Sequence, residues 1–122
     1  MSDRTTAKIM ILEDETLIAL STQQTLEDLG YEDLDVFYRL DPAIEAAKTT
    51  RYDAAVLDVN VDRGRTSLDL ARALKADGTA ILFASGNTAD GDDLREIATV
   101  VLGKPYSDEH LGAAMKDLFD AI

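Results

Sequence analysis

The stretch Ile9-Met10-Ile11-Leu12-Glu13-Asp14-Glu15, near the start of this 122-residue chain, changes abruptly from apolar to acidic side chains. Four consecutive apolar residues without polar alternation are typical of a strand buried on both faces, as in a parallel sheet. The acidic residues then follow at the carboxyl end of that strand. In open α/β sheets, binding sites form beyond the carboxyl ends of the strands. This stretch therefore predicts both a parallel sheet and an acidic site at its edge.

Further apolar runs of strand length recur along the chain. Clear runs lie within residues 53–58, 79–84 and 99–102, and a weaker one covers residues 34–38. Helix signals occupy the gaps between the runs. Residues 15–29 end before Gly30, residues 67–77 end before Gly78, and residues 107–122 carry one apolar face behind a capping Ser107. The pair Asp41-Pro42 indicates an N-cap followed by proline at the first position of another helix.

The strict alternation of five strands and five helices predicts an α/β fold. We expect a doubly wound, five-stranded parallel sheet with helices on both faces and the flavodoxin-like strand order 2-1-3-4-5. The length corresponds to one domain over residues 1–122, with no output domain expected.

The amino-acid composition excludes several classes of function and of site. The formal net charge of −12 argues against binding to a nucleic-acid backbone, which requires Lys and Arg to neutralise phosphates. The chain has no cysteine, so disulfides and thiolate metal sites are excluded. No apolar run approaches the length of a membrane span, and the start lacks the apolar stretch of a secretory signal. A cytoplasmic protein that is a monomer or a weak dimer is the expectation.

Polar residues follow four of the predicted strands. Glu13 and Asp14 follow the first, Asp58 the third, Ser85 the fourth and Lys104 the fifth. Carboxylates held close together raise one another's pKa values unless a cation lies between them, and Mg²⁺ prefers oxygen ligands. A carboxylate can attack phosphorus to form an aspartyl phosphate, which a lysine and a hydroxyl would help to stabilise. Together these residues predict a phosphoryl-accepting magnesium site.

Each of these residues also has an ordinary structural explanation. Glu13 and Asp14 can begin a helix, where acidic residues favour the helix dipole. Asp58 can cap a helix, Ser85 can form a turn, and Lys104 can be a surface residue before a proline. We favour the joint explanation because the topology brings the four strand ends to one edge of the sheet.

The same motifs resemble those of bacterial response-regulator receiver domains. Residues 9–15 are similar to the opening strand and acidic pair of that family, and residues 55–60 to its phosphoacceptor segment. Residues 83–86 are similar to its hydroxyl-bearing strand end, and Lys104-Pro105-Tyr106 to its Lys-Pro-aromatic segment. The resemblance covers essentially the whole chain.

The resemblance implies a role for each site residue. Asp58 would be the phosphoacceptor, and Glu13, Asp14, Asp58 and the backbone carbonyl of Asn60 would hold Mg²⁺. Ser85 and Lys104 would bind the phosphoryl oxygens. The donor would be a histidine kinase or a histidine phosphotransfer protein. A receiver of this kind is not an enzyme acting on other molecules, because it promotes only its own phosphorylation and dephosphorylation.

Two features depart from the usual receiver pattern. Val101 occupies the position of the aromatic residue that commonly reports phosphorylation, three residues before the lysine. Phe83-Ala84-Ser85-Gly86 is similar to the signature of the stand-alone FAT GUY subgroup, although Ser85 replaces its threonine and Asn87 its tyrosine. That subgroup generally lacks the aromatic switch as well. Without an aromatic switch, we expect phosphorylation to order residues 86–98, whose clear apolar anchors are Leu94 and Ile97.

Three functions remain open from the sequence. The phosphorylated protein can bind a further protein or drain phosphate from a kinase. A degenerate receiver can act as an adaptor without phosphorylation, although the intact acidic residues and Lys104 count against it. A haloacid-dehalogenase-like phosphatase also uses an aspartate after a strand, but it needs a second aspartate where this chain has Asn60.

Overall fold

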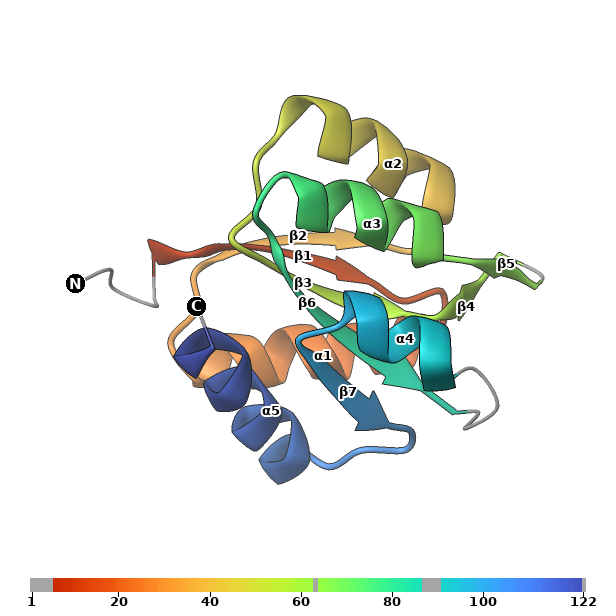
Figure 1. Ribbon diagram of the computed structural model, residues 1–122. Helices are drawn as coiled ribbons and strands as arrows, with labels where there is room; N and C mark the ends of the chain where they lie inside the picture. Colours follow the sequence, from red (N-terminus) through yellow and green to blue (C-terminus); the bar gives the residue numbers. More distant parts are fainter. Residues whose placement is uncertain (1–5, 63, 87–90, 122) are drawn as a thin grey trace.

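The computed structural model describes residues 6–62, 64–86 and 91–121. Its centre is a parallel sheet with the order β2-β1-β3-β6-β7 (Figure 1). The strands are β1 (Lys8–Leu12), β2 (Asp33–Phe37), β3 (Ala54–Asp58), β6 (Ala80–Ser85) and β7 (Val100–Gly103). Counted along the chain, these five strands follow the flavodoxin-like order 2-1-3-4-5, which confirms the predicted topology.

Helices cover both faces of this sheet (Figure 1). Helices α2 (Leu40–Thr49), α3 (Leu68–Ala76) and α4 (Gly91–Ile97) lie over one face. Helices α1 (Thr16–Asp28) and α5 (Asp108–Asp120) lie over the other. None of the helices that the structure describes has the length and apolar character needed to cross a membrane.

The apolar runs form two cores because successive strand residues point to opposite faces. The first core contains Met10, Leu12, Ala55 and Leu57 together with apolar residues of α2, α3 and α4. The second contains the alternate residues of the same strands, including Ile9, Ile11, Ala54 and Val56, packed against α1 and α5. Burial on both sides explains why the strands lack polar alternation. Packing on both faces also fixes the positions of the residues at the strand ends.

The threonines of α1 explain its imperfect apolar stripe. Thr22 shares a hydrogen bond of 2.7 Å with the hydroxyl of Tyr106, and Thr25 donates one of 2.8 Å to Asp108. The first contact joins α1 to the segment between β7 and α5, and the second joins it to the first residue of α5. The capping role predicted for Ser107 is confirmed, because its hydroxyl accepts from the backbone N–H of His110.

The predicted start of α2 is wrong. The N-cap is Arg39 rather than Asp41, and Asp41 lies in the first turn. The reason is tertiary: the Asp62 carboxylate accepts the Leu40 N–H at 2.6 Å, so a distant residue satisfies the helix end. Asp41 forms an ion pair with Arg65 at 3.0 Å instead.

A short hairpin directly after β3 was not predicted. It consists of β4 (Asn60–Val61) and β5 (Arg65–Thr66), which pair antiparallel and project beyond the sheet (Figure 1). Asp62 and Gly64 both have positive φ angles, of 47° and 92°, as tight turns require. The sequence analysis placed no strand here, and Arg63 lies outside the described residues.

Helix α4 lies within residues 86–98, the segment that phosphorylation is expected to order. The apolar anchors Leu94 and Ile97 are both buried, in the core on the α3 side of the sheet. The preceding residues 87–90 lie outside the described part of the chain. The expectation that phosphorylation orders residues 86–98 therefore stays a prediction.

Candidate functional site

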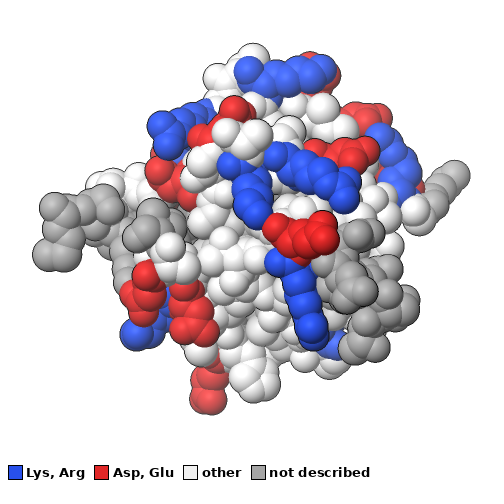
Figure 2. Space-filling model, in the orientation of Figure 1, with Lys and Arg blue, Asp and Glu red and all other residues white. Residues whose placement is uncertain are grey.

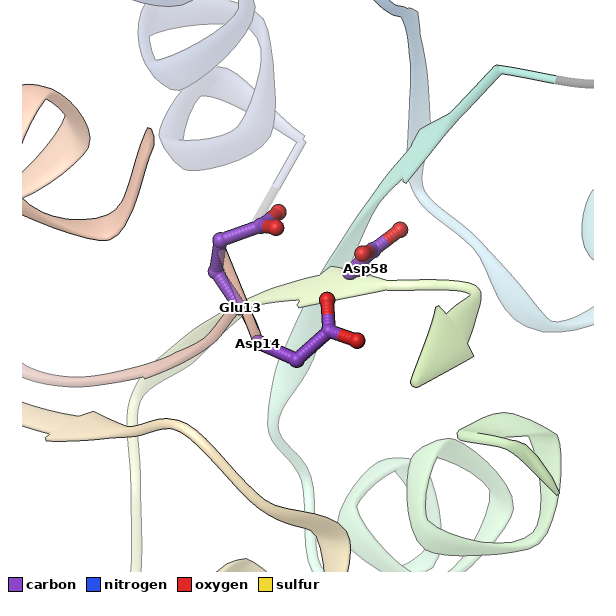
Figure 3. Close-up of side chains that lie close together, drawn as sticks. All are labelled: Glu13, Asp14 and Asp58. Atoms are coloured by element: carbon purple, nitrogen blue, oxygen red, sulfur yellow. The ribbon is translucent and has the colours of Figure 1, made fainter. Parts of the chain in front are cut away.

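The sheet register brings the predicted acidic residues together. Leu12 pairs with Leu57, so Glu13 and Asp14 leave β1 at the level where Asp58 ends β3. Carboxylate oxygens of Glu13, Asp14 and Asp58 all lie within 4.8 Å of one another. Figure 3 shows the three side chains grouped at this edge of the sheet. The residues come from two strands that are far apart in the sequence, so it is the pairing of β1 with β3 that brings them together.

Glu13 is the most buried of the three acids, with 3% of its surface exposed. Its Oε2 accepts a hydrogen bond of 2.8 Å from the Lys104 ammonium, and its Oε1 accepts one of 3.1 Å from the backbone N–H of Glu15. Both oxygens of Glu13 therefore already have partners. Asp14 is exposed at the mouth of the site.

Lys104 links two of the carboxylates. Its Nζ lies 2.8 Å from Glu13 and 3.3 Å from Asp58. Burial lowers the pKa of Lys104, but its hydrogen bond to Glu13 and the charge of Asp58 outweigh burial and leave the pKa raised. The lysine is therefore a stable cation at neutral pH, placed against the side chain that is predicted to receive the phosphoryl group.

Asp58 is buried at the end of β3, with 8% of its surface exposed. Burial and the neighbouring charge of Glu13 raise the pKa of Asp58 from 3.8 to about 6, although Lys104 acts in the opposite direction. Burial is the larger of the two causes and the charge of Glu13 adds to it, so Lys104 offsets them only in part. Three carboxylates and one ammonium give the cluster a deficit of positive charge that a divalent cation would fill.

Ser85 and Asn60 lie on the elements next to this cluster. Ser85 is the last residue of β6, one position beyond Ala84, which pairs with Asp58. The backbone N–H of Lys104 donates to the Ser85 carbonyl at 2.9 Å, so these two predicted phosphoryl ligands are joined. Asn60 is exposed at the start of β4, two residues after Asp58. The role of its carbonyl as a metal ligand stays a prediction.

Ser67 is a buried residue of the site that sequence reasoning missed. Its hydroxyl donates to the backbone carbonyl of Asp58 at 2.7 Å, and its side chain is wholly buried. The sequence marked Ser67 only as the start of a helix. A serine directly before an apolar periodic segment ordinarily indicates an N-cap, which concealed this contact.

A groove adjoins the cluster on the α1 side. It has a volume of about 390 Å³, and Lys104 belongs to both the cluster and the groove wall. The other walls are the first half of α1, Pro105 and Tyr106, and Leu17 at its rim is 81% exposed. On the face that Figure 2 shows, acidic and basic side chains are interspersed rather than gathered in one basic surface.

The family model of the response regulator receiver domain matches residues 9–116. The chain belongs to this family. The match includes all six residues that the sequence analysis placed in the site. Receiver domains belong to two-component response regulators, and the acidic cluster of this receiver fits phosphoryl acceptance.

Individual relatives agree with this assignment. The receiver is 32% identical over 120 residues to the transcriptional regulatory protein CrdR of Helicobacter pylori, covering 93% of this chain and 55% of that protein. The chain thus spans about half the length of this curated relative. Among solved structures it is similar to chemotaxis response regulator CheY4 of Vibrio cholerae, with a TM-score of 0.82, 25% identity, and coverage of 93% and 99% of the two chains.

A second solved structure shows the same likeness. It is the CheY-like receiver domain from Methylobacillus flagellatus, with a TM-score of 0.81 and 25% identity. The alignment covers 93% of this receiver and 98% of that chain. The expected receiver family and fold are therefore confirmed, whereas none of these relatives tests membership of the FAT GUY subgroup.

Proposed function

We propose that this receiver accepts a phosphoryl group on Asp58, in a Mg²⁺-dependent reaction, from the phosphohistidine of a histidine kinase or a histidine phosphotransfer protein. The observation that carries the proposal is the grouping of Asp58 with Glu13, Asp14 and Lys104 at one end of the sheet. A structural salt bridge alone would need only one carboxylate for the lysine. Three carboxylates around one ammonium leave negative charge that costs stability and that a cation would offset.

A carboxylate oxygen of Asp58 attacks phosphorus, the bond from phosphorus to the donor's imidazole nitrogen breaks, and its electron pair stays on that nitrogen. When bound, Mg²⁺ supplies the positive charge that neutralises the phosphoryl oxygens and the nearby carboxylates. Lys104 exchanges its contact with Asp58 for a phosphoryl oxygen, and the Ser85 hydroxyl donates to another.

The predicted ligand set fits the contacts of the acidic residues. Asp14, which is exposed, and Asp58 would bind the ion directly, together with the Asn60 carbonyl. Glu13 already holds Lys104 and the Glu15 N–H, so it would act through a water molecule. Mg²⁺ commonly retains several waters and uses few protein ligands, in keeping with such a site.

The groove beside α1 is the side from which we expect the donor protein to approach. It is continuous with the site through Lys104, and its rim carries the exposed apolar residue Leu17. A donor that covers this groove would place its phosphohistidine beside Asp58. Apolar surface next to a reactive group is a common feature of protein interfaces.

We further propose that the chain acts as a single-domain receiver of the FAT GUY type. The support is the segment Phe83–Ser85 with Gly86 and the absence of an aromatic residue at Val101, which is 46% exposed on the edge strand β7. Such a receiver would signal by binding another protein or by draining phosphate from a kinase. An unphosphorylated adaptor is the second candidate, and a phosphatase is disfavoured because Asn60 offers no general acid.

The experiment is phosphorylation by acetyl phosphate in the presence of Mg²⁺, followed by intact-mass measurement. We expect one phosphoryl adduct in the wild-type protein and none in Asp58→Asn, which keeps the shape of the side chain but loses the nucleophile. A generic phosphate ester should not be turned over. An adduct that persists in Asp58→Asn would show that another residue is the acceptor, and no adduct in the wild type would favour the adaptor.

A further inference from the structure

We propose that Ser67 is a positioning residue for phosphoryl acceptance, which fixes the backbone between the phosphoacceptor Asp58 and the predicted metal ligand Asn60. The inference rests on the function proposed above and assigns a role to a residue outside the charged cluster. Ser67 touches neither the phosphoryl group nor the ion in this proposal. It acts through the two peptide groups that separate Asp58 from Asn60.

Ser67 contacts both of those peptide groups. Its hydroxyl donates to the Asp58 carbonyl at 2.7 Å, and its backbone N–H donates to the Val59 carbonyl at 2.9 Å. The N–H of the first peptide group, that of Val59, donates to the Ala84 carbonyl of β6 at 3.1 Å. The peptide group that follows Asp58 is therefore held at both its oxygen and its nitrogen. Ser67 supplies one of these two restraints with its side chain.

The Ser67 side chain bonds the Asp58 carbonyl and does not cap the helix that follows it. Ser67 is the N-cap residue of α3, yet its side chain forms no capping hydrogen bond. Ser107, at the same position of α5, does accept a capping hydrogen bond of 3.1 Å from His110. In α3 the hydroxyl is used to hold the phosphoacceptor strand instead.

The β4–β5 hairpin, which lies between Asp58 and Ser67, is also attached to α2. Asn60 pairs with Thr66, directly before Ser67. Asp62 caps α2 through the Leu40 N–H, and Arg65 pairs with Asp41 of the same helix. Asp62 and Arg65 attach the hairpin to α2, and Ser67 holds its base. The backbone at Asn60 is thus held in a set position relative to the Asp58 carboxylate.

Removing the hydroxyl should therefore weaken the site more than the fold. In Ser67→Ala, the buried Asp58 carbonyl loses its partner, and the peptide group can rotate to find another. Rotation there changes the direction of both the Asp58 side chain and the Asn60 carbonyl. Loss of an outer residue that orients metal ligands typically lowers metal affinity by at least about tenfold.

Thr79 provides a matched control, because its side-chain hydrogen bond lies near the start of β3, at the opposite end from Asp58. Its hydroxyl donates to the Tyr52 carbonyl, also at 2.7 Å and also buried, just before β3 begins. Thr79→Val and Ser67→Ala each remove one buried hydroxyl from a hydrogen bond to a backbone carbonyl, just before the start of β3 and at its last residue, respectively. The two variants should lose similar thermal stability, whereas only Ser67→Ala disturbs the end of β3 that carries Asp58.

The test measures Mg²⁺ affinity by calorimetric titration, and the rate of acetyl phosphate labelling at several Mg²⁺ concentrations. We expect Ser67→Ala to weaken Mg²⁺ binding about tenfold and to shift the labelling midpoint equally. Thr79→Val should match the wild type in both measurements. Ser67→Thr, which keeps the hydroxyl, should recover most of the lost affinity.

The outcomes separate the two proposals. Equal Mg²⁺ affinity in Ser67→Ala and Thr79→Val, in a wild type that becomes labelled, would overturn the role of Ser67 alone. A Ser67→Ala protein that fails to fold while Thr79→Val folds would also overturn it, because Ser67 would then serve general stability. A wild-type protein that takes up no phosphoryl group would instead overturn the function on which this inference rests.

Discussion

At the scale of single residues, the site concentrates charge in a place where burial makes charge costly. Asp58 and Glu13 are both buried and both lie beside Lys104. One ammonium offsets only part of the repulsion, so the carboxylates stabilise the site only when a further cation is present. The sequence analysis found these residues because each follows an apolar run directly. It missed Ser67, because a serine before a helix already has a sufficient local explanation as a cap.

The raised pKa of Asp58 predicts a pH dependence of stability. The pKa of about 6 in the folded protein exceeds the ordinary 3.8, so the folded state holds this proton more tightly than the unfolded state does. Its stabilising contribution is complete below about pH 4 and is lost as pH rises through about 6. The loss amounts to at most about 3 kcal/mol. Asp58→Asn lacks this titration.

Urea unfolding at a series of pH values, in the presence of a chelator, measures the contribution of Asp58 to the pH dependence of stability. The free energy of unfolding of the wild type, relative to Asp58→Asn, should fall as pH rises from about 4 through about 6 and level off above about pH 7. Parallel pH profiles for the two proteins would contradict the raised pKa and the repulsion from which it arises.

At the scale of elements, the two regions beside the site differ in how firmly they are held. The hairpin β4–β5 is attached to α2 and Ser67, whereas α4 is a short helix of 7 residues. Two buried anchors, Leu94 and Ile97, hold α4 to the core, and Lys75 of α3 donates to its Glu96 carbonyl at 2.7 Å. A helix of this length depends on such tertiary contacts for its stability. It is therefore the element best suited to respond to phosphorylation.

Phosphorylation should be reported by residues 86–98 rather than by a ring at position 101. Val101 has no aromatic ring, and the segment begins directly after Ser85, which the phosphoryl group would draw inward. Amide hydrogen exchange, with and without Mg²⁺ and beryllofluoride as a phosphoryl mimic, tests this idea. We expect slower exchange across residues 86–98 in the mimic-bound protein, with α2, which contains no residue of the site, serving as an internal control. Equal exchange in both states would assign the response to Tyr106 or α5 instead.

At the scale of the whole molecule, one sheet with two cores supports a site made from several strand ends. Both faces of the sheet are covered, so the strands cannot shift without disturbing a core. The fold thereby holds like charges together that would separate in a flexible chain. The net charge of −12 adds to this repulsion and should make the free protein sensitive to divalent cations.

Mg²⁺ should therefore stabilise the whole protein. A ligand that binds only the folded state adds about 2.7 kcal/mol at a hundredfold excess over its dissociation constant. We expect the thermal midpoint to rise with Mg²⁺ concentration at neutral pH, and to rise far less in the double variant Glu13→Gln with Asp14→Asn. A matched concentration of NaCl controls for general screening, and an equal rise with both salts would argue against a specific site.

Much of this receiver follows from the sequence by itself. Strand and helix positions, the strand order and the residues at the carboxyl edge are predictable because apolar periodicity is local and parallel crossovers permit few topologies. Other features appear only in the tertiary structure. Asp62 caps a helix 22 residues away, and Ser67 bonds a carbonyl 9 residues back. Such contacts depend on how loops meet after the strands have packed, and a capping or turn-forming residue can satisfy several partners equally well until that packing selects one.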